Sequence, residues 1–306
     1  MRRAKFITCR LGVAAILLGA LPILSMAQQR GQKTFSSPQD ACMALVLAMQ
    51  TDDEKTLLEI LGPEGKQIVS SGDDVEDAEN RTNFVRRYRE MHRMVEEPNG
   101  VIMYIGAENW PMPIPIVGRD GFWYFDTEVG KKEILYRRIG RNEISTIRVC
   151  QELVAAEMEY YSAQREYAQK IFSDQGQRNG LYWKAGDWEA ESPIGPLVAA
   201  AVAEGYTNVR DGAPVPYRGY YYRILTGQGK NSPGGPKNYI VDGKMTNGFA
   251  FIAYPAEYRS SGVMTFIVNE DGMVYQKDLG SKTDALAKAM KEYNPNSGWQ
   301  KAEDPR

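Results

Sequence analysis

Apolar residues recur every three or four positions after residue 35, which is the spacing of one face of a helix. Ser37, Pro38 and Asp40 open the first of these patterns as a hydroxyl N-cap, a first-turn proline and a first-turn acid. Gly62-Pro63 ends the second. The pattern predicts four helical segments, over residues 37–50, 53–61, 65–69 and 75–97.

Short apolar runs bounded by Gly, Asn and Asp follow these helices and predict strands. The runs cover residues 101–105, 112–117 and 122–125. Prolines at 111, 113 and 115 place the middle run at a sheet edge or in an extended surface strap, because proline has no N–H to donate. Residues 36–130 are therefore expected to form an N-terminal α+β module of helices on a small antiparallel meander.

Helical spacing returns over residues 131–171, carried by residues such as Ile147 and Met158. Gly140 predicts a break in the first part of this segment. A helix of about 27 residues from Ile144 would be about 40 Å long. That length suggests a spine on which a sheet packs.

The last hundred residues hold the strongest strand patterns, over 220–225, 249–254, 263–268 and 273–275. The runs at 249–254 and 263–268 are apolar on both faces, so they should be central strands covered on each side. Asn269 to Gly272 predicts a hairpin turn between the last two runs. Short helices are expected over 192–204 and 283–293. Residues 131–306 thus form a long helix packed on a C-terminal antiparallel sheet, and the fold class is α+β.

Residues 1–27 have the pattern of a secretory signal peptide. Four basic residues precede an apolar run over 11–24, and Ser25 and Ala27 supply the small residues that signal peptidase reads. We expect cleavage after Ala27 and a periplasmic or secreted protein. The apolar run is shorter than the roughly 20 residues that cross a bilayer, so no stable membrane span is expected after cleavage. Residues 28–35 form a flexible lead-in.

Charge and rare residues exclude several classes of function. The 39 acids outnumber the 37 basic residues, which form no basic block, so no nucleic-acid partner is expected. His92 is the only histidine and lies in the charged helical pattern, which leaves no His-rich metal site. Cys42 and Cys150 remain after cleavage and suit two buried thiols, with a disulfide between them as the alternative. We expect no cofactor and no metal.

Clustered carboxylates are the remaining candidates for chemistry. Asp73, Asp74, Glu76, Asp77 and Glu79 suit a solvated helix start better than a calcium site, because their spacing does not match an EF-hand loop. Asp126, Glu128 and Glu143 suit an ion-paired helix start better than a glycosidase-like pair, which would need two acids roughly 5–10 Å apart in a cleft. Acids facing each other across a Trp-lined cleft would favour this chemistry, whereas acids paired with nearby arginines would oppose it.

Aromatic and charged side chains near loops are the candidate binding residues, because aromatic rings can stack on sugars or line a groove. These candidates are Trp110, Trp123, Arg137, Arg138, Arg141, Glu143, Trp183, Trp188, Tyr220 and Tyr222. Strand alternation puts Tyr221 on the opposite face from Tyr220 and Tyr222, so one of these two sets is expected in the core.

Several motifs along the chain are similar to those of a known family. They include Ile60-Leu61-Gly62-Pro63, the prolines after Trp110, Arg137-Arg138-Ile139-Gly140-Arg141, Ser192-Pro193-Ile194-Gly195-Pro196-Leu197 and Gly262-Val263-Met264-Thr265-Phe266. Together they resemble the secreted bacterial family catalogued as domain of unknown function 2950. The resemblance covers nearly the whole mature chain and implies no catalytic residue.

A second likeness concerns the C-terminal half. Tyr160 and Tyr167, the Gly219–Tyr222 run and Ala253-Tyr254-Pro255 are similar to the head domain of type IV pilins and pseudopilins. It implies a helix-plus-sheet shape and not filament incorporation, since the pilin leader and its hydrophobic helix are absent. The N-terminal module loosely resembles cystatin and NTF2-like folds.

Three functions fit these patterns. The first is an exported, non-catalytic binding or structural protein of the bacterial cell envelope, with an envelope protein or a glycan as its partner. The second is a carboxylate-dependent hydrolase acting on glycan or peptidoglycan. The third is a soluble subunit of an envelope assembly.

Overall fold

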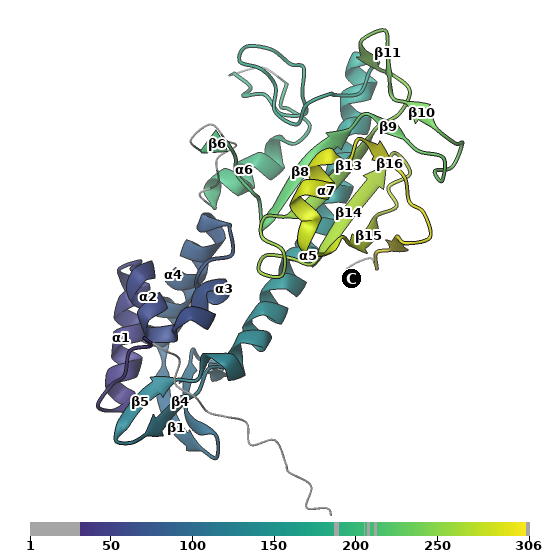
Figure 1. The fold of residues 1–306 in the computed structure, drawn as a ribbon. Helices are drawn as coiled ribbons and strands as arrows, with labels where there is room; N and C mark the ends of the chain where they lie inside the picture. The colour runs from purple at the N-terminus through teal and green to yellow at the C-terminus, as the bar shows by residue number, and fades with distance from the viewer. Residues whose placement is uncertain (1–30, 187–189, 205, 207–208, 211–212, 304–306) are drawn as a thin grey trace, which may run out of the picture.

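The computed structural model describes residues 31–186, 190–204, 206, 209–210 and 213–303. The expected signal peptide, residues 1–27, lies outside the described residues. Two α+β modules are joined by one long helix, α5 (Thr127–Gln164), which runs from the N-terminal module into the C-terminal one (Figure 1). This is the α+β architecture that the hydrophobic pattern predicts.

The N-terminal module packs helices on an antiparallel sheet. Its helices are α1 (Pro38–Gln50), α2 (Glu54–Leu61), η1 (Pro63–Gly65), α3 (Lys66–Val69) and α4 (Asp74–Glu90). Its strands are β1 (His92–Glu97), β2 (Gly100–Ile105), β3 (Trp110–Pro111), β4 (Ile116–Arg119) and β5 (Phe122–Phe125). The strand order is β1-β2-β4-β5, with β3 paired to β2. Helices α1 and α2 contact β5, and α4 contacts β1 and β2.

Local sequence signals hold at the start of this module. The Ser37 hydroxyl accepts a hydrogen bond from the Asp40 N–H at 3.1 Å, and Asp53 caps α2 in the same way. Before α1, the Gln32 side chain is buried and donates to the Ile60 and Phe125 carbonyls. The predicted Ser37 cap is confirmed, and the chain is held to the module from Gln32 onward.

The predicted helix over 75–97 is wrong at its C-terminal end. Helix α4 stops at Glu90, and β1 then pairs with β2 from His92 opposite Ile105 to Glu97 opposite Gly100. Gly100 has a φ of +124°, a conformation that favours glycine and closes the hairpin. Pairing with an apolar neighbouring strand outweighs the helical pattern of the charged segment. His92 therefore begins a strand, with its ring stacked 3.9 Å from that of Tyr88.

The proline-rich stretch is an extended strap between strands, which is one of the two predicted arrangements, but it is partly buried and not confined to the surface. Only Trp110–Pro111 pairs as β3, and β4 begins at Ile116. Between them Met112 and Ile114 point into the core, with 5% and 1% of their surface exposed. The prolines alternate with these apolar residues, so the strap closes the core without adding a full strand.

Helix α5 is continuous through Gly140, so the predicted break there is wrong. It has 38 residues, which is about 57 Å at 1.5 Å per residue, and it begins at Thr127. Arg138 and Asn142, on either side of Gly140, are both buried against other elements, and these contacts outweigh the roughly 1 kcal/mol that a helical glycine costs. The helix ends at Gln164, short of the predicted 171, because Arg165 takes a left-handed conformation with φ of 61°.

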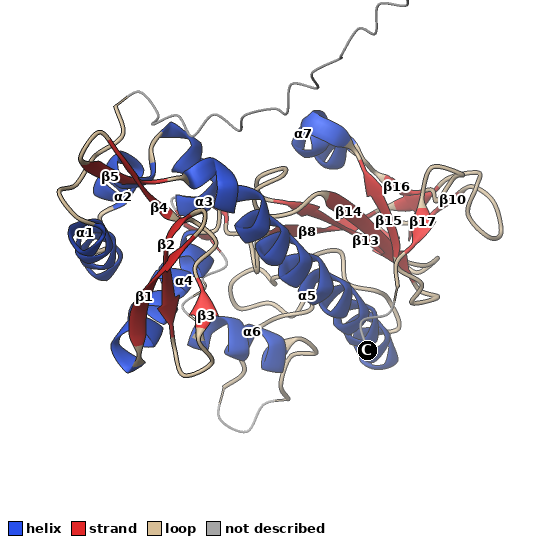
Figure 2. Ribbon diagram, turned by 90° about the horizontal axis from the view of Figure 1, so that it is seen from below, coloured by secondary structure: helices blue, strands red, loops and turns tan. Residues whose placement is uncertain are grey.

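The C-terminal module is an antiparallel sheet between two helices. Its strands are β8 (Tyr220–Leu225), β13 (Ala250–Pro255), β14 (Met264–Asn269), β15 (Tyr275–Asp278) and β17 (Gln300–Lys301), in the order β17-β15-β14-β13-β8. Helix α5 contacts β13 and β14, and α7 (Thr283–Ala289) contacts β13. The two helices lie on opposite faces of the sheet (Figure 2). Strand β13 is buried along its whole length, which confirms the predicted central strands.

Smaller elements surround this sheet. They are α6 (Gly195–Ala203), η2 (Gly280–Lys282), β6 (Val209–Arg210), β7 (Ala213–Pro214), β9 (Gly227–Gln228), β10 (Lys237–Asn238), β11 (Ile240–Val241), β12 (Lys244–Met245) and β16 (Glu292–Tyr293). The predicted last helix over 283–293 ends at Ala289, and its final residues form β16. In the part of the chain that the structure describes, no helix combines the length and apolar character that crossing a bilayer requires.

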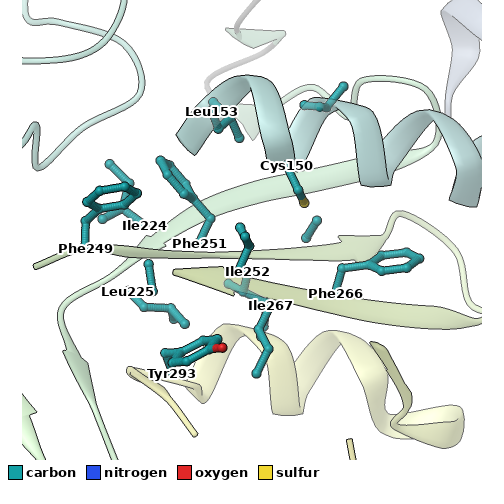
Figure 3. Packing of buried hydrophobic residues seen from close by; sticks show 14 of the residues in the cluster. Cys150, Leu153, Ile224, Leu225, Phe249, Phe251, Ile252, Phe266, Ile267 and Tyr293 are labelled. Carbon is teal, nitrogen blue, oxygen red and sulfur yellow. The ribbon is translucent and has the colours of Figure 1, made fainter. Parts of the chain in front are cut away.

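Each module has its own hydrophobic core, and each core holds one cysteine. Cys42 lies in the N-terminal core, where its Sγ is 3.1 Å from the Met103 sulfur. Cys150 lies between α5 and the C-terminal sheet (Figure 3). Both are free and buried, as predicted, and burial raises the pKa of the Cys150 thiol to about 12. Across the sheet, Tyr293 packs under the opposite face (Figure 3).

Two glycines of α5 give a matched test of this helix. A Cβ at Gly130 would lie 2.6 Å from the Pro113 backbone, whereas a Cβ at Gly140 meets nothing within 4 Å. We expect Gly130→Ala to lower the free energy of unfolding by about 1–3 kcal/mol and Gly140→Ala to raise it by up to about 1 kcal/mol. Urea unfolding of the mature protein measures both. Destabilisation by Gly140→Ala would contradict a continuous helix.

Candidate functional site

A cavity of about 510 Å³ lies in the N-terminal module between α4, the first half of α5 and the sheet. Its apolar lining comes from α1, α2, α3, α4, β2, β3, the strap and α5: Met49, Leu57, Leu61, Ile68, Val69, Phe84, Ile105, Trp110, Met112, Ile114 and Ile134. Its polar lining is Asp77, Asn80, Arg81, Asn83, Arg86, Arg87, Arg137, Arg138 and Arg141. We call the apolar lining the floor of the cavity and the polar lining its wall, which holds six arginines and one carboxylate.

Helical spacing brings this wall together. On α5, Ile134, Arg137, Arg138 and Arg141 follow each other at intervals that place them on one face. On α4 the same rule groups residues 77, 80, 81, 84 and 87. Four of the residues predicted as binding candidates from sequence, Trp110 and the three arginines of α5, thus line one cavity.

Arg138 is held in place by the short helix α3, which precedes α4. Its guanidinium donates to the Gln67 carbonyl at 2.7 Å and to the Ile68 carbonyl, both in α3. Its Nη2 lies 3.9 Å from Oδ1 of Asp77, and only 7% of its side chain is exposed. Arg138 is therefore a positioning residue that holds α3 against α5.

Arg141 and Arg137 lie nearer to solvent. Arg141 pairs with Oε1 of Glu76 at 2.6 Å. Arg137 donates from Nε to Glu133 at 2.8 Å, and its guanidinium carbon lies 5.6 Å from the centre of the Trp110 ring. Half of the Arg137 side chain is exposed. Among the described residues, its two terminal nitrogens donate no hydrogen bond, so these donors are available to a ligand.

Three of the acids predicted on a solvated helix face are buried instead. Asp73 accepts hydrogen bonds from the Tyr206 hydroxyl at 3.0 Å and from the Gly219 N–H at 2.8 Å. Glu76 accepts from the Asn142 side chain at 3.0 Å, and the buried Asp77 accepts from the Ser71 N–H. The solvated-face prediction fails because these partners come from the α3–α4 turn, from α5 and from the C-terminal module, and no pattern within residues 73–79 indicates the two distant sources.

We call this set of contacts the polar junction: Asp73, Glu76 and Asp77 with Arg138, Arg141, Asn142, Tyr206 and Gly219. Asn142 also donates to the Ser261 carbonyl at 3.1 Å, and the Ser260 hydroxyl donates toward the Gln67 and Ser70 carbonyls. Gly219 has a φ of +76°, and a Cβ there would lie 2.5 Å from Nδ2 of Asn142. The polar junction joins the two modules beside the cavity.

Burial controls the titration of the acids in the polar junction. Desolvation raises the pKa of Asp77 to about 6 and outweighs the nearby charge of Arg138 and the Ser71 hydrogen bond. Desolvation likewise raises the pKa of Asp73, against three hydrogen bonds that lower it. Desolvation also lowers the pKa of Arg138, whereas the nearby charge of Asp77 raises it. Asp77 in the polar junction therefore changes its charge near pH 6.

The other predicted binding residues lie elsewhere. Trp123 lines an open hollow of about 600 Å³ at the tips of the β1–β2 and β4–β5 hairpins. None of the six arginines of the cavity lines this hollow. Trp183 donates from its indole to the Ala190 carbonyl at 3.2 Å, and Trp188 lies outside the described residues. The structure therefore does not bring Trp123 or Trp183 to the cavity.

Tyr220, Tyr222 and Glu143 serve the C-terminal core. Tyr220 is completely buried and donates to the Met264 carbonyl, so its prediction as a surface binding residue is corrected. The Tyr222 hydroxyl lies 3.3 Å from the Thr146 hydroxyl on α5. Oε1 of Glu143 accepts from the N–H groups of Val263 and Met264 at 3.0 and 2.9 Å. Glu143 thereby ties the start of β14 to α5.

No catalytic pair emerges from the acids singled out in the sequence. Glu143 is engaged with backbone, and Asp126 is the N-cap residue of α5, where burial raises its pKa. Within the described ranges no three His, Cys, Asp or Glu side chains are grouped to hold a metal ion. The three arginines of α5 are paired with Asp77, Glu76 and Glu133. The arrangement suits binding of an anion better than acid–base chemistry.

Sequence reasoning missed the α4 side of the cavity. Arg81 pairs with Asp52 and donates to the Val69 carbonyl, and Arg87 pairs with Glu108 at 3.3 Å. The signal was present in the spacing of Asp77, Arg81 and Phe84 along one helix face, but the acids and arginines of α4 are also typical of a solvated helix.

Comparison with protein families supports the resemblance stated above. A family model described as "Protein of unknown function (DUF2950)" matches residues 32–302, and the chain belongs to this family. No curated protein and no solved structure matches the chain. The family description names no activity, and the likeness to pilin heads stays a prediction.

Asp77 gives a pH test of the polar junction. Its ordinary pKa of 3.8 applies to the unfolded chain, and its folded pKa is about 6. The folded state thus keeps a proton that the unfolded state has lost, so stability falls as pH rises from about 4 to 6. We expect Asp77→Asn to remove this loss of stability. At about 1.4 kcal/mol for each pKa unit, the loss amounts to up to about 3 kcal/mol.

Urea unfolding at several pH values between 4 and 8 measures the effect. The stability of Asp77→Asn relative to wild type should rise through pH 4–6 and then stay level. Glu79→Gln, at an exposed position of the same helix, is the control. A difference between Asp77→Asn and wild type that does not depend on pH would contradict the buried carboxyl.

Proposed function

We propose that this member of the DUF2950 family is an exported, non-catalytic binding protein of the bacterial cell envelope. The N-terminal module takes a small molecule into the cavity between α4 and α5. The observation that carries this proposal is the lining of that cavity, in which arginines stand over a floor of apolar side chains. A volume of about 510 Å³ lies in the range of small-molecule sites.

The pairing of the charged groups supports binding over hydrolysis of glycan or peptidoglycan. A carboxylate-driven hydrolase needs one acid free to donate a proton and a second free to attack or activate water. Glu76 and Glu133 each contact an arginine here, and Glu143 holds two backbone N–H groups. None of these three acids lines the cavity, and each is engaged with a partner of its own.

The role of envelope-assembly subunit stays an alternative. Met43 and Leu47, one helical turn apart on α1, are 66% and 60% exposed. A protein partner could cover this face, but such contact would lie outside the arginine cavity.

Isolation of the protein from its compartment tests the proposal. The full chain with its leader is expressed in bacteria, and the periplasmic fraction is examined by mass spectrometry under denaturing and native conditions. We expect a chain that begins at Gln28 and carries a small molecule that denaturation releases. An intact leader on a cytoplasmic protein would contradict export, and an empty protein would contradict binding.

A matched pair of variants locates the bound molecule. Asn83 lines the cavity on α4, whereas the neighbouring Thr82 is exposed and outside it. Asn83→Trp should fill part of the cavity and reduce the bound fraction several-fold, while Thr82→Trp leaves it unchanged. Equal loading of the two variants would place the ligand elsewhere and overturn the proposed site.

A further inference from the structure

The charged side chains that line the cavity are mainly positive. Six arginines face the space and Asp77 is the one acid among the lining residues that the structure describes. The other carboxylates that pair with these arginines, such as Glu133 and Glu108, lie outside the lining. A cation or a neutral polar molecule gains little from such a wall, whereas an anion gains charge-assisted hydrogen bonds.

Among the three arginines of α5, Arg137 has donors to spare. Arg138 donates to two backbone carbonyls, and Arg141 pairs with Glu76. Arg137 uses its Nε for Glu133 and stands against the Trp110 ring, which restricts the guanidinium while its terminal nitrogens stay open. Asn83 also lines the space, and its side-chain amide has no hydrogen-bond partner among the described residues.

The floor of the cavity is apolar and rigid. Leu57, Leu61, Ile105 and Ile114 belong to the N-terminal core and are at most 1% exposed. A sugar laid on this floor would lose hydrogen bonds from its hydroxyls to water without replacement, at a cost of roughly 1–3 kcal/mol for each buried hydroxyl. An aliphatic or aromatic body would instead gain about 25 cal/mol for each Å² it buries.

From these observations we infer that the cavity binds an amphipathic anion: a compact apolar body that carries one carboxylate or phosphate head. The head group bonds to Arg137 beside Trp110, and the body lies on the floor formed by the N-terminal core. This assignment rests on the proposed binding function and names the class of ligand for the same cavity.

Calorimetric titration of the mature protein with defined probes tests the ligand class. The probes are decanoate, decyl phosphate, decyltrimethylammonium and chitotriose, each kept below any micelle-forming concentration. We expect decanoate or decyl phosphate to bind, and the tighter of the two identifies the acid. Binding of decyltrimethylammonium as tight as that of both anions would overturn the inference, because apolar contact alone would then explain it.

Variants of exposed arginines test the head-group position. Arg137→Gln should weaken binding of the preferred anion about tenfold or more, as expected for a lost charged hydrogen bond. Arg89→Gln, at an exposed position of α4 outside the lining, should leave binding unchanged. Glu133→Gln releases the Nε of Arg137 and should not weaken binding. Equal affinities of Arg137→Gln and Arg89→Gln would overturn the assignment.

Failure of this inference can be told apart from failure of the binding function. If chitotriose binds, Asn83→Trp blocks it and neither anion binds, the cavity is a ligand site of another class. If no probe binds and the protein isolated from the periplasm is empty, the binding function itself fails. Thermal unfolding of each variant beside wild type shows that the fold is retained, because an exposed pair such as Arg137–Glu133 contributes little to stability.

Discussion

Buried carboxylates at the start of α4 constrain the arrangement of the whole molecule. An ionised acid removed from water is costly unless hydrogen bonds and opposite charge compensate it. Asp73, Glu76 and Asp77 find partners that compensate part of this cost on α5, in the α3–α4 turn and in the C-terminal module. The two modules must therefore meet at this point, and the meeting point sets the positions of α4 and α5 around the cavity.

Helix α5 connects this constraint to both cores. Its first half presents Arg137, Arg138 and Arg141 to the cavity and to the acids of the polar junction. Its second half buries Cys150 and Leu153 against the C-terminal sheet. Glu143, near the middle of the helix, ties it to β14. One rigid element thus carries the candidate binding residues on a scaffold that is packed at both ends, as a preformed site requires.

The sequence predicts the elements of this fold better than it predicts their contacts. Local signals such as the Ser37 cap, the Gly62 stop and the two-sided apolar runs of β13 and β14 correspond to elements of the structure. The charged pattern after Glu90 predicts a helix, because nothing in that segment indicates its pairing with β2. Gly140 suggested a break that the buried Arg138 and Asn142 prevent.

The candidate site was also predictable only in part, because sequence patterns indicate elements better than the contacts between them. Trp110 and the arginines of α5 stand out by type and are brought together by helical spacing and by the strap. Tyr220 stands out equally by type, yet it is core, because burial depends on which face of β8 meets α5. The burial of Asp73, Glu76 and Asp77 depends on residues more than 60 positions away, such as Asn142 and Gly219. No pattern within α4 distinguishes these acids from solvated ones.

A double-mutant cycle between Glu76 and Asn142 tests the central claim most directly, because this hydrogen bond joins α4 to α5 and Asn142 also holds Ser261. Free energies of unfolding are measured for Glu76→Ala, Asn142→Ala and the double variant of the mature protein. If the polar junction acts as one unit, the two changes should couple by about 1 kcal/mol or more. Effects that add to within about 0.3 kcal/mol would show that the buried acids and α5 stabilise the protein independently, contrary to this account.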